Sequence, residues 1–321
     1  MARQRDCDAT NSVKLRLPPV RPVGSCGGWM KTTADRIGSY VKAVSSVVLG
    51  RTPAGRNLTV FGDDTFLVSY VRSGSTWARF LLGNLIHQPE VVNFSNVTRL
   101  VPSIYEFPDR RLRSLPRVMK SHECFDPRYP RVIHLVRDPR DVAVSFYHYC
   151  LKTRVLSDGF PLDDFVTRFI AATVVPYADR LGSWEDHTAS WLRMRQGRNN
   201  YHLIRYEDLL ANPQGELAKL AAILKIDLSP ERVERAIQLS SAKNMRTLER
   251  QQWQQWTATK GTREDIPFVR EAKAGGWRRH LSTASVEQIE SAWGATIEAL
   301  GYELSAGQPL HSSSERPYAA R

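Results

Sequence analysis

The chain alternates between short apolar runs and longer segments whose apolar residues recur at helical spacing. The short runs, each of which we expect to be a strand, are Phe66–Tyr70, Val118–Lys120, Val132–Val136 and His202–Arg205. The amphipathic segments predict helices over Thr76–Ile86, Arg140–Leu151, Leu162–Ala171, Trp184–Arg195, Gly215–Leu224 and Pro230–Leu239. Such alternation is typical of an α/β fold in which helices cover both faces of a parallel sheet.

The two ends of the chain do not share this alternation. Residues 1–33 are rich in Pro, Gly, Ser and Arg without periodicity, which predicts a disordered basic segment. Residues 34–50 predict an amphipathic helix, and packing on the body is favoured over a membrane surface because few cations accompany its apolar face. Residues 304–321 are rich in Ser, Pro and Ala and predict a flexible tail. We therefore expect one folded domain over residues 55–303.

Length and composition narrow the class of protein. A chain of 321 residues with 42% hydrophobic content can bury a full core, and it is long for one domain but short for two. No apolar run reaches the roughly 18 residues of a transmembrane helix. The first residues also lack the apolar core of a signal peptide. These features predict a cytoplasmic protein without a transmembrane segment.

Charge and cysteine usage point to the kind of ligand. The formal net charge is +12, and most of it lies outside the two ends of the chain, which suits a polyanionic ligand. No zinc-finger, basic-zipper or RNA-recognition motif is visible, so a small phosphorylated ligand is favoured over nucleic acid. The four cysteines show no C-x-x-C spacing, and neither a zinc site nor a disulfide framework is indicated.

The segment after the first predicted strand is the clearest candidate for chemistry. Tyr70 is followed by the loop 71–76, Val-Arg-Ser-Gly-Ser-Thr, and then by an amphipathic helix that begins near Trp77. A strand that enters a helix through such a loop directs backbone N–H groups at one spot and forms an anion site. The loop is not a nucleotide-triphosphate loop of the G-x-x-x-x-G-K-[ST] type, because the first Gly and the Lys are missing.

A second candidate lies where the third predicted strand meets its helix. Asp138 and Pro139 form an N-cap and a first-turn proline, so Arg137 stands at the strand end. Ser145 lies two turns further on and on the same helix face, so Arg137 and Ser145 could hold one phosphate together. In the alternative reading, Arg137 pairs with Asp138 or Asp141 and Ser145 is a small packing residue.

Four segments together resemble the sulfotransferases that use 3′-phosphoadenosine-5′-phosphosulfate (PAPS), in a bacterial-like version of the cytosolic type. The first loop is similar to their P-K-S-G-T-T-W loop, with Val71 and Arg72 in place of Pro and Lys. The run R-D-P-R-D-V-A-V-S-F-Y-H from Arg137 resembles their 3′-phosphate segment. Residues 206–213 are similar to Y-E-D-L-x-x-N-P, and residues 268–277 resemble R-K-G-x-x-G-D-W. The resemblance covers about residues 57–303 in family order.

The resemblance implies a fold, a reaction and a donor site. The fold is a single α/β domain, P-loop-NTPase-like, with a parallel sheet flanked by helices and a 5′-phosphosulfate-binding loop. The reaction moves a sulfuryl group from PAPS to a hydroxyl, or less readily an amine, of a small-molecule, sugar or lipid acceptor. The implied donor residues are Arg72, Ser73, Gly74, Ser75 and Thr76 for the 5′-phosphosulfate, Arg137, Ser145 and Arg270 for the 3′-phosphate, and Trp77, Tyr206 and Ser240 for the adenine.

The resemblance also assigns the transfer step to Lys120-Ser121-His122, which is similar to the family's K-T-H. His122 would remove the acceptor's proton, because histidine titrates near neutral pH, while Lys120 and Arg72 would face the sulfuryl oxygens. Glu123 is the alternative base, and a capping or core role is the alternative for His122. We expect no metal, because two fixed cations can supply what Mg²⁺ supplies in phosphoryl transfer.

Several departures from the family pattern bear on these roles. Arg72 replaces a Lys, and Glu271 and Ala272 replace the Lys and Gly after the Arg of R-K-G. A carboxylate beside the 3′-phosphate is unfavourable, so we expect Glu271 to point away or Lys273 to take over. Ala242 stands where an aromatic residue usually flanks adenine, so stacking would fall to Trp77. The dimerisation signature survives only in part, which leaves dimerisation open.

Two other functions compete with this interpretation. A non-catalytic binding protein for a phosphonucleotide or nucleic acid would share the basic cleft but would need neither Lys120 nor His122. A small-molecule kinase would share the sheet, but the Walker Lys is absent. The acceptor is not named by the sequence, although an aromatic-lined pocket is suggested by Tyr105, Phe107, Phe125, Phe146, Tyr147 and Tyr149.

Overall fold

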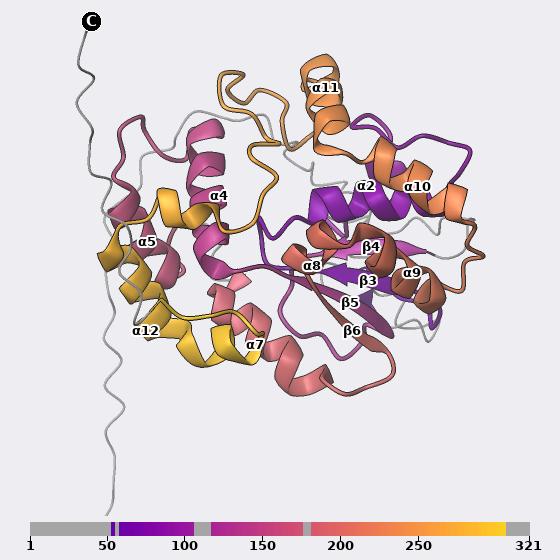
Figure 1. Cartoon of the computed structure of the whole chain (residues 1–321), viewed down its shortest axis with the longest axis horizontal. Helices are drawn as coiled ribbons and strands as arrows, with labels where there is room; N and C mark the ends of the chain where they lie inside the picture. Colours follow the sequence, from indigo (N-terminus) through magenta and orange to yellow (C-terminus); the bar gives the residue numbers. More distant parts are fainter. Residues whose placement is uncertain (1–52, 55–57, 106–116, 176–180, 306–321) are drawn as a thin grey trace, which may run out of the picture. The chain divides into compact units, whose positions relative to one another are not determined.

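The computed structural model describes residues 53–54, 58–105, 117–175 and 181–305, which Figure 1 draws as coloured ribbon. The predicted basic segment 1–33, the predicted helix 34–50 and residues 306–321 lie outside the described residues. Phe107, one of the aromatic residues assigned to a pocket, lies outside them as well.

Four parallel strands form the sheet. They are β3 (Thr65–Val68), β4 (Val118–Ser121), β5 (Arg131–Val136) and β6 (Tyr201–Arg205), in the order β4-β3-β5-β6. All three pairings are parallel, and the register places Leu67 beside Lys120 on one side and Ile133 on the other. The predicted parallel sheet is therefore confirmed. A short antiparallel pair that was not predicted, β1 (Pro53–Ala54) and β2 (Leu58–Thr59), stands apart from it.

Both faces of the sheet are covered. Leu67 and Ile133 point to one face and pack with residues of α2, α8, α9 and α10, whereas Phe66 and Val132 point to the other and pack with Trp191 of α7. The period of two along each strand explains this division. The helices named here are α2 (Ser75–Ile86), α7 (Trp184–Arg195), α8 (Tyr206–Ala211), α9 (Pro213–Leu224) and α10 (Pro230–Leu239).

A second group of helices lies to one side of the sheet (Figure 1). It contains α4 (Pro139–Lys152), α5 (Leu162–Ile170) and α12 (Thr283–Ala299), and aromatic side chains such as Phe165, Phe169 and Trp293 fill its core. The remaining elements are α3 (Val97–Leu100), α11 (Ala242–Gln252) and the 3-10 helix η1 (Gly276–Arg279). None of the described helices combines the length and apolar character that a membrane span requires.

The six helices predicted for the folded domain are present, whereas five helical elements of the described residues were not predicted. They are α3, α8, α11, α12 and η1. The buried residues Val286, Ile289, Trp293 and Ile297 of α12 recur at helical spacing, so its signal was present in the sequence. By contrast, α8 begins at Tyr206 directly after β6 ends at Arg205. No turn residues separate the two elements, so nothing in the sequence marks where the helix begins.

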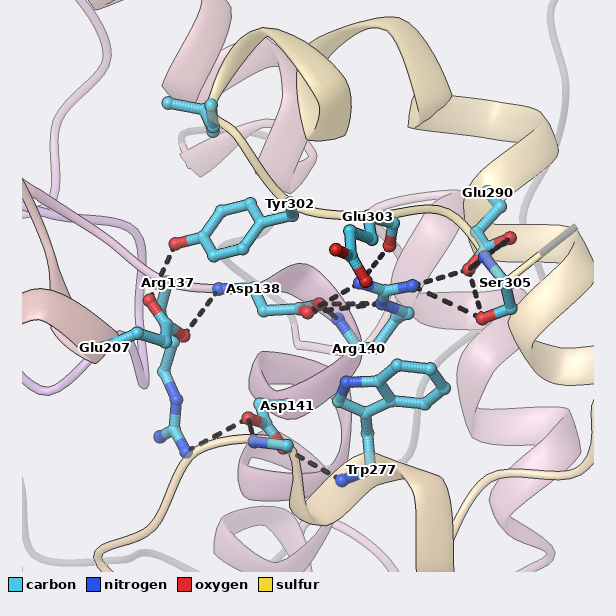
Figure 2. A network of polar contacts seen from close by, with 12 residues as sticks. Arg137, Asp138, Arg140, Asp141, Glu207, Trp277, Glu290, Tyr302, Glu303 and Ser305 are labelled. Carbon is cyan, nitrogen blue, oxygen red and sulfur yellow. Dashed lines mark hydrogen bonds and ion pairs between the residues drawn. The ribbon is translucent and has the colours of Figure 1, made fainter. Parts of the chain in front are cut away.

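The junction of β5 and α4 is fixed by a polar network (Figure 2). The side chain of Asp138 caps α4 by accepting from the amide of Arg140, as the sequence predicts. The buried Arg140 guanidinium also donates to Asp138 at 2.7 Å, to Glu290 of α12 at 2.5 Å and to the carbonyl of Glu303 at 2.9 Å. These bonds tie the start of α4 to the C-terminal part of the domain and so fix Arg137, the residue before the cap.

Two buried histidines make the fold sensitive to acid. His134 of β5 and His187 of α7 are fully buried, and burial lowers the pKa of both, to about 3 for His187. The unfolded chain therefore binds more protons below the ordinary histidine pKa, and stability is lost as pH falls from there. Each histidine should cost about 1 kcal/mol of unfolding free energy between pH 6.5 and 5.5.

We predict that His187→Phe makes the unfolding free energy less dependent on pH. Urea unfolding at pH 6.5 and 5.5 should show the acid-induced loss reduced by about 1 kcal/mol relative to wild type. Equal losses in the two proteins would contradict a neutral His187 in the folded state.

Candidate functional site

One cavity of about 640 Å³ lies where the strands of the sheet end. The segments that follow β3, β4, β5 and β6 all reach it, as expected for the carboxyl edge of a parallel sheet. Every residue that the sequence assigned to the site lines this cavity except the buried Ser73. The predicted lining residues are Arg72, Gly74, Ser75, Thr76, Trp77, Lys120, His122, Arg137, Ser145, Tyr206, Ser240 and Arg270.

The loop between β3 and α2 needs a glycine at its end. Gly74 has φ 101°, in the left-handed region, and a Cβ placed there would lie 2.6 Å from the ring of Tyr206. Arg72 is also left-handed, with φ 64°. These turns bring the chain from the end of β3 into α2 within six residues.

The start of α2 keeps its polar groups for a ligand. Among the described residues, no side chain caps α2, whereas Asp138 caps α4 and Ser183 caps α7. The buried Ser73 hydroxyl has no hydrogen-bond partner among these residues either. Uncapped amides at the positive end of a helix, beside a buried hydroxyl, fit an anion.

Arg72 is held between two aromatic rings. Its guanidinium carbon lies 4.7 Å from the ring centre of Tyr149 and 4.5 Å from that of Phe268. Its nitrogen atoms donate to the Ser145 hydroxyl at 3.3 Å and to the Phe268 carbonyl at 3.4 Å. Burial is the main cause that lowers the pKa of Arg72 to about 10. Arg72 and Ser145, which the sequence assigned to opposite ends of one ligand, are therefore in direct contact.

Arg137 lies flat on an aromatic ring and is only partly satisfied. Its guanidinium carbon is 4.2 Å from the ring centre of Tyr206, and Nη2 donates to the carbonyl of Lys273 at 3.0 Å. Its Nε is buried without a hydrogen-bond partner among the described residues. Arg137 Nη2 lies 3.8 Å from Asp141 Oδ2, so the ion pair proposed as the alternative is present. The Nε–H group stays available to a ligand.

Asp141 is a residue that the sequence analysis named only as a partner, and it holds a neighbouring segment. Its two carboxylate oxygens accept from the amides of Gly275 at 2.7 Å and Trp277 at 2.9 Å (Figure 2). Burial raises the pKa of Asp141, although the charge of Arg137 and the two amides oppose that effect. Asp141 thus joins α4 to the segment that carries Arg270.

Glu271 was expected to point away from a 3′-phosphate or to be replaced there by Lys273, and this alternative stays a prediction. Glu271 lines the cavity, and its carboxylate accepts from Arg270 at 2.7 Å. It also contacts Arg279 at 2.7 Å and His280 at 3.0 Å. Lys273 lines the same cavity, where its carbonyl oxygen holds Arg137.

His122 is oriented with one ring nitrogen toward the backbone. Its Nδ1 lies 2.6 Å from the carbonyl oxygen of Ser69. A carbonyl only accepts, so Nδ1 carries the hydrogen and Nε2 keeps its lone pair. Desolvation, followed by the charge of Lys120, lowers the pKa of His122 well below its usual value. The ring is therefore neutral at physiological pH and can accept a proton at Nε2.

The neighbours of His122 fix its backbone and supply a cation. The amide of His122 donates to the Tyr105 hydroxyl at 2.9 Å. Lys120 lies with its ammonium 5.6 Å from the ring centre of Tyr105. Glu123 also lines the cavity, and its charge acts with burial to raise the pKa of the Tyr105 hydroxyl. A neutral histidine, a cation and a carboxylate therefore line the same cavity.

The residues that the sequence assigned to the adenine form a second group. Trp77 donates through Nε1 to the carbonyl of Ser240 at 3.0 Å and meets Tyr206 edge to face, 5.4 Å between ring centres. The Ser240 hydroxyl accepts from Asn84 of α2 at 3.0 Å, a contact that sequence reasoning missed. Ala242, the first residue of α11, lines the cavity beside them.

The aromatic-lined pocket is confirmed for some of the predicted residues. Tyr105, Phe146 and Tyr149 line the cavity, as do Trp256 and Phe268, which were not predicted for this role. Two of the predicted residues do not line it. Phe125 packs edge to face against Trp191, and the Tyr147 hydroxyl donates to the carbonyl of Phe160.

Helix α11 holds the segment 268–271 against the cavity. The buried Glu249 carboxylate accepts from the amides of Phe268 at 2.5 Å and Val269 at 2.9 Å. Arg246, one turn earlier, donates to the carbonyls of Val269 at 3.1 Å and Arg270 at 2.5 Å. The two side chains position both the ring that covers Arg72 and the Arg270 side chain. Nothing local in the sequence signals these contacts, because their partners lie about 20 residues further on.

No metal site is visible in the part of the chain that the structure describes. Within it, no three His, Cys, Asp or Glu side chains gather where they could hold an ion. Independence of a metal therefore stays a prediction.

Comparison with known proteins gives a consistent family. The family model described as "Sulfotransferase domain" matches residues 62–301. Sulfotransferase 2B1 of Homo sapiens is 27% identical over 246 residues, which cover 72% of this chain and 65% of the human protein. The match thus spans just under two thirds of that relative. The 3-beta-hydroxysteroid sulfotransferase of Cavia porcellus is 26% identical over 240 residues, covering 71% of this chain and 81% of the relative.

Solved structures share the fold. The mouse sulfotransferase SULT7A1, solved in complex with PAP, superposes with a TM-score of 0.59 at 21% sequence identity. The match covers 81% of this chain and 89% of the mouse chain.

We predict that Glu249→Ala loosens the segment 268–271. Loss of two bonds to a carboxylate should cost about 3 kcal/mol of local stability, so hydrogen exchange at the amides of Phe268 and Val269 should accelerate about 100-fold. Glu264→Ala, at an exposed carboxylate, is the control and should leave exchange at these amides unchanged. Unchanged exchange in Glu249→Ala would contradict the role given to this carboxylate.

Proposed function

Because the chain belongs to the sulfotransferase domain family, whose members are PAPS-dependent enzymes, we propose that it transfers a sulfuryl group from PAPS to a hydroxyl of a small apolar acceptor. The observation that carries the proposal is the position of His122. Its unprotonated Nε2 belongs to a ring that lines the same cavity as the uncapped start of α2.

The residues of the cavity fit the donor. Two buried donor groups, the Ser73 hydroxyl and Arg137 Nε, have no partner within the described residues and suit phosphate oxygens. The loop 72–76 would hold the 5′-phosphosulfate, and Arg137, Ser145 and Arg270 would hold the 3′-phosphate. Trp77, Tyr206 and Ser240 would hold the adenine, with Trp77 as the stacking ring because Ala242 offers none.

The contact between Arg72 and Ser145 refines this assignment. The two side chains are 3.3 Å apart, so the groups that bind the two ends of the donor touch each other before it binds. Arg72 stays charged, and its planar guanidinium can contact two oxygens at once.

In the transfer step, His122 Nε2 accepts the proton of the acceptor hydroxyl as that oxygen bonds to sulfur. The bond between sulfur and the bridging oxygen breaks, and 3′-phosphoadenosine 5′-phosphate (PAP) leaves with the electron pair. Lys120 and Arg72 stabilise the negative charge that develops on the sulfuryl and bridging oxygens. The donor supplies the activated sulfuryl group, and the protein supplies alignment, a base and fixed cations.

An apolar acceptor is favoured by the cavity wall. Part of the wall is formed by aromatic and aliphatic side chains, namely Phe146, Tyr149, Leu181, Trp256, Ala258 and Phe268. A relative named for 3-beta-hydroxysteroids is consistent with a hydroxyl on an apolar frame. Polar side chains such as Glu123 and Ser241 also line the cavity, so a sugar acceptor is an outcome that a panel of acceptors must test.

The two competing functions are not favoured. A kinase would require a Walker Lys, which the loop 71–76 lacks, and a non-catalytic binder would not need His122 oriented as a base. The cytoplasmic location and the oligomeric state stay predictions.

His122→Ala should reduce kcat for sulfuryl transfer by roughly 10²–10⁴-fold, the usual effect of removing a general base. The affinity for PAP should change little, because His122 faces the acceptor. Desolvation and the charge of Lys120 lower the pKa of His122. The kcat/KM of the wild type should therefore stay constant as the pH is lowered to 6.5 and should fall only in more acidic buffer. Steady-state kinetics and calorimetric titration with PAP measure these quantities.

His202→Ala serves as the matched control, because this histidine does not line the cavity. Its kcat should equal that of wild type. Wild-type kcat in His122→Ala with an inactive Glu123→Gln would transfer the role of base to Glu123 and contradict the proposal.

A further inference from the structure

The 3′-phosphate end of the cavity contains acidic as well as basic side chains. Arg137 and Arg270 are its guanidinium groups, and each already has a carboxylate neighbour, Asp141 and Glu271 respectively. Asp141 is committed to two backbone amides and is buried. Among the described residues, the side chain of Glu271 accepts from other side chains and from no backbone amide, so it can exchange partners more readily than Asp141.

Glu271 is shared among three cationic or protonatable groups. One oxygen accepts from Arg270 at 2.7 Å and lies 3.0 Å from His280 Nε2, and the other accepts from Arg279 at 2.7 Å. Arg279 and His280 lie on η1 and directly after it, and both are exposed. If Arg270 turned to another anion, Glu271 would keep Arg279 and His280 and would not be left as an unpaired charge.

A phosphate monoester competes well for Arg270. It carries more negative charge than a carboxylate and offers three oxygens, so a guanidinium binds it at least as strongly. Arg270 cannot donate fully to both anions with the same nitrogen atoms, and a carboxylate beside a phosphate repels it. Glu271 occupies Nη1 of Arg270, so a 3′-phosphate that binds through Nη1 displaces Glu271, and the lost ion pair reduces the net affinity.

We propose that Glu271 is a positioning and specificity-determining residue that competes with the 3′-phosphate for Arg270 and so weakens the binding of 3′-phosphorylated nucleotides. The inference rests on the proposed function and concerns the same site. Its consequence is faster release of PAP after transfer, because the free enzyme regains the Arg270–Glu271 ion pair. Nucleotides without a 3′-phosphate do not require the exchange and should be unaffected.

The experiment is calorimetric titration of the full chain with PAP and with adenosine 5′-phosphate. Glu271→Gln keeps the shape of the side chain but removes the charge, and it should tighten PAP binding by about 5-fold. Its affinity for adenosine 5′-phosphate should stay within about twofold of wild type. Glu287→Gln, at an exposed carboxylate of α12, makes the same charge change and should alter neither affinity.

A double-mutant cycle with Arg270→Ala tests whether the effect runs through Arg270. In that background Glu271→Gln should no longer tighten PAP. Stopped-flow release of PAP should be slower in Glu271→Gln than in wild type.

Three results would overturn the inference while leaving the proposed function intact. They are unchanged or weaker PAP binding by Glu271→Gln, an equal gain for both nucleotides, and a gain that persists without Arg270. Wild-type protein that binds PAP no tighter than adenosine 5′-phosphate would instead overturn the proposed function, and the inference with it.

Discussion

The site depends on holding like charges together in one cavity. Arg72, Arg137, Arg270 and Lys120 all line it, and burial, followed by the charge of Arg137, lowers the pKa of both Arg72 and Arg270. The protein stabilises these cations mainly with groups that do not consume their charge: the faces of aromatic rings and backbone carbonyl oxygens. The cavity therefore keeps a positive field that suits an anionic ligand, although Asp141 and Glu271 each lie beside one of the guanidinium groups.

The cations are brought together by one edge of the sheet and by two carboxylates, Glu249 and Asp141, that bind backbone amides. The parallel strands end together, so the loops after β3, β4 and β5 bring Arg72, His122 and Arg137 to one place. From the other side, Glu249 and Asp141 bind backbone amides of residues 268–277 and hold that segment over the loops. The loops at the edge of the sheet and the segment 268–273 thus line one cavity from two sides.

The sequence was sufficient for the parts of the site that are local. The strand ends and the helix start at Asp138 follow from short patterns. The lowered pKa of His122 does not, because it results from burial and from the charge of Lys120 in the folded chain. The roles of Glu249 and Glu271 could not be predicted, because each depends on which side chain of a distant helix or turn reaches it in the folded chain. Helix α12 is different, because the helical spacing of its buried residues is visible in the sequence.

An assay of sulfuryl transfer from PAPS is the most direct test of the proposed function. Purified protein is incubated with PAPS carrying radiolabelled sulfur and a panel of phenols, sterols, sugars and amines, and label and PAP are quantified together. The account predicts label on an apolar hydroxyl acceptor with one PAP formed per sulfated product. The proposed function would be contradicted if no acceptor in the panel became labelled and the protein bound PAP and adenosine 5′-phosphate equally.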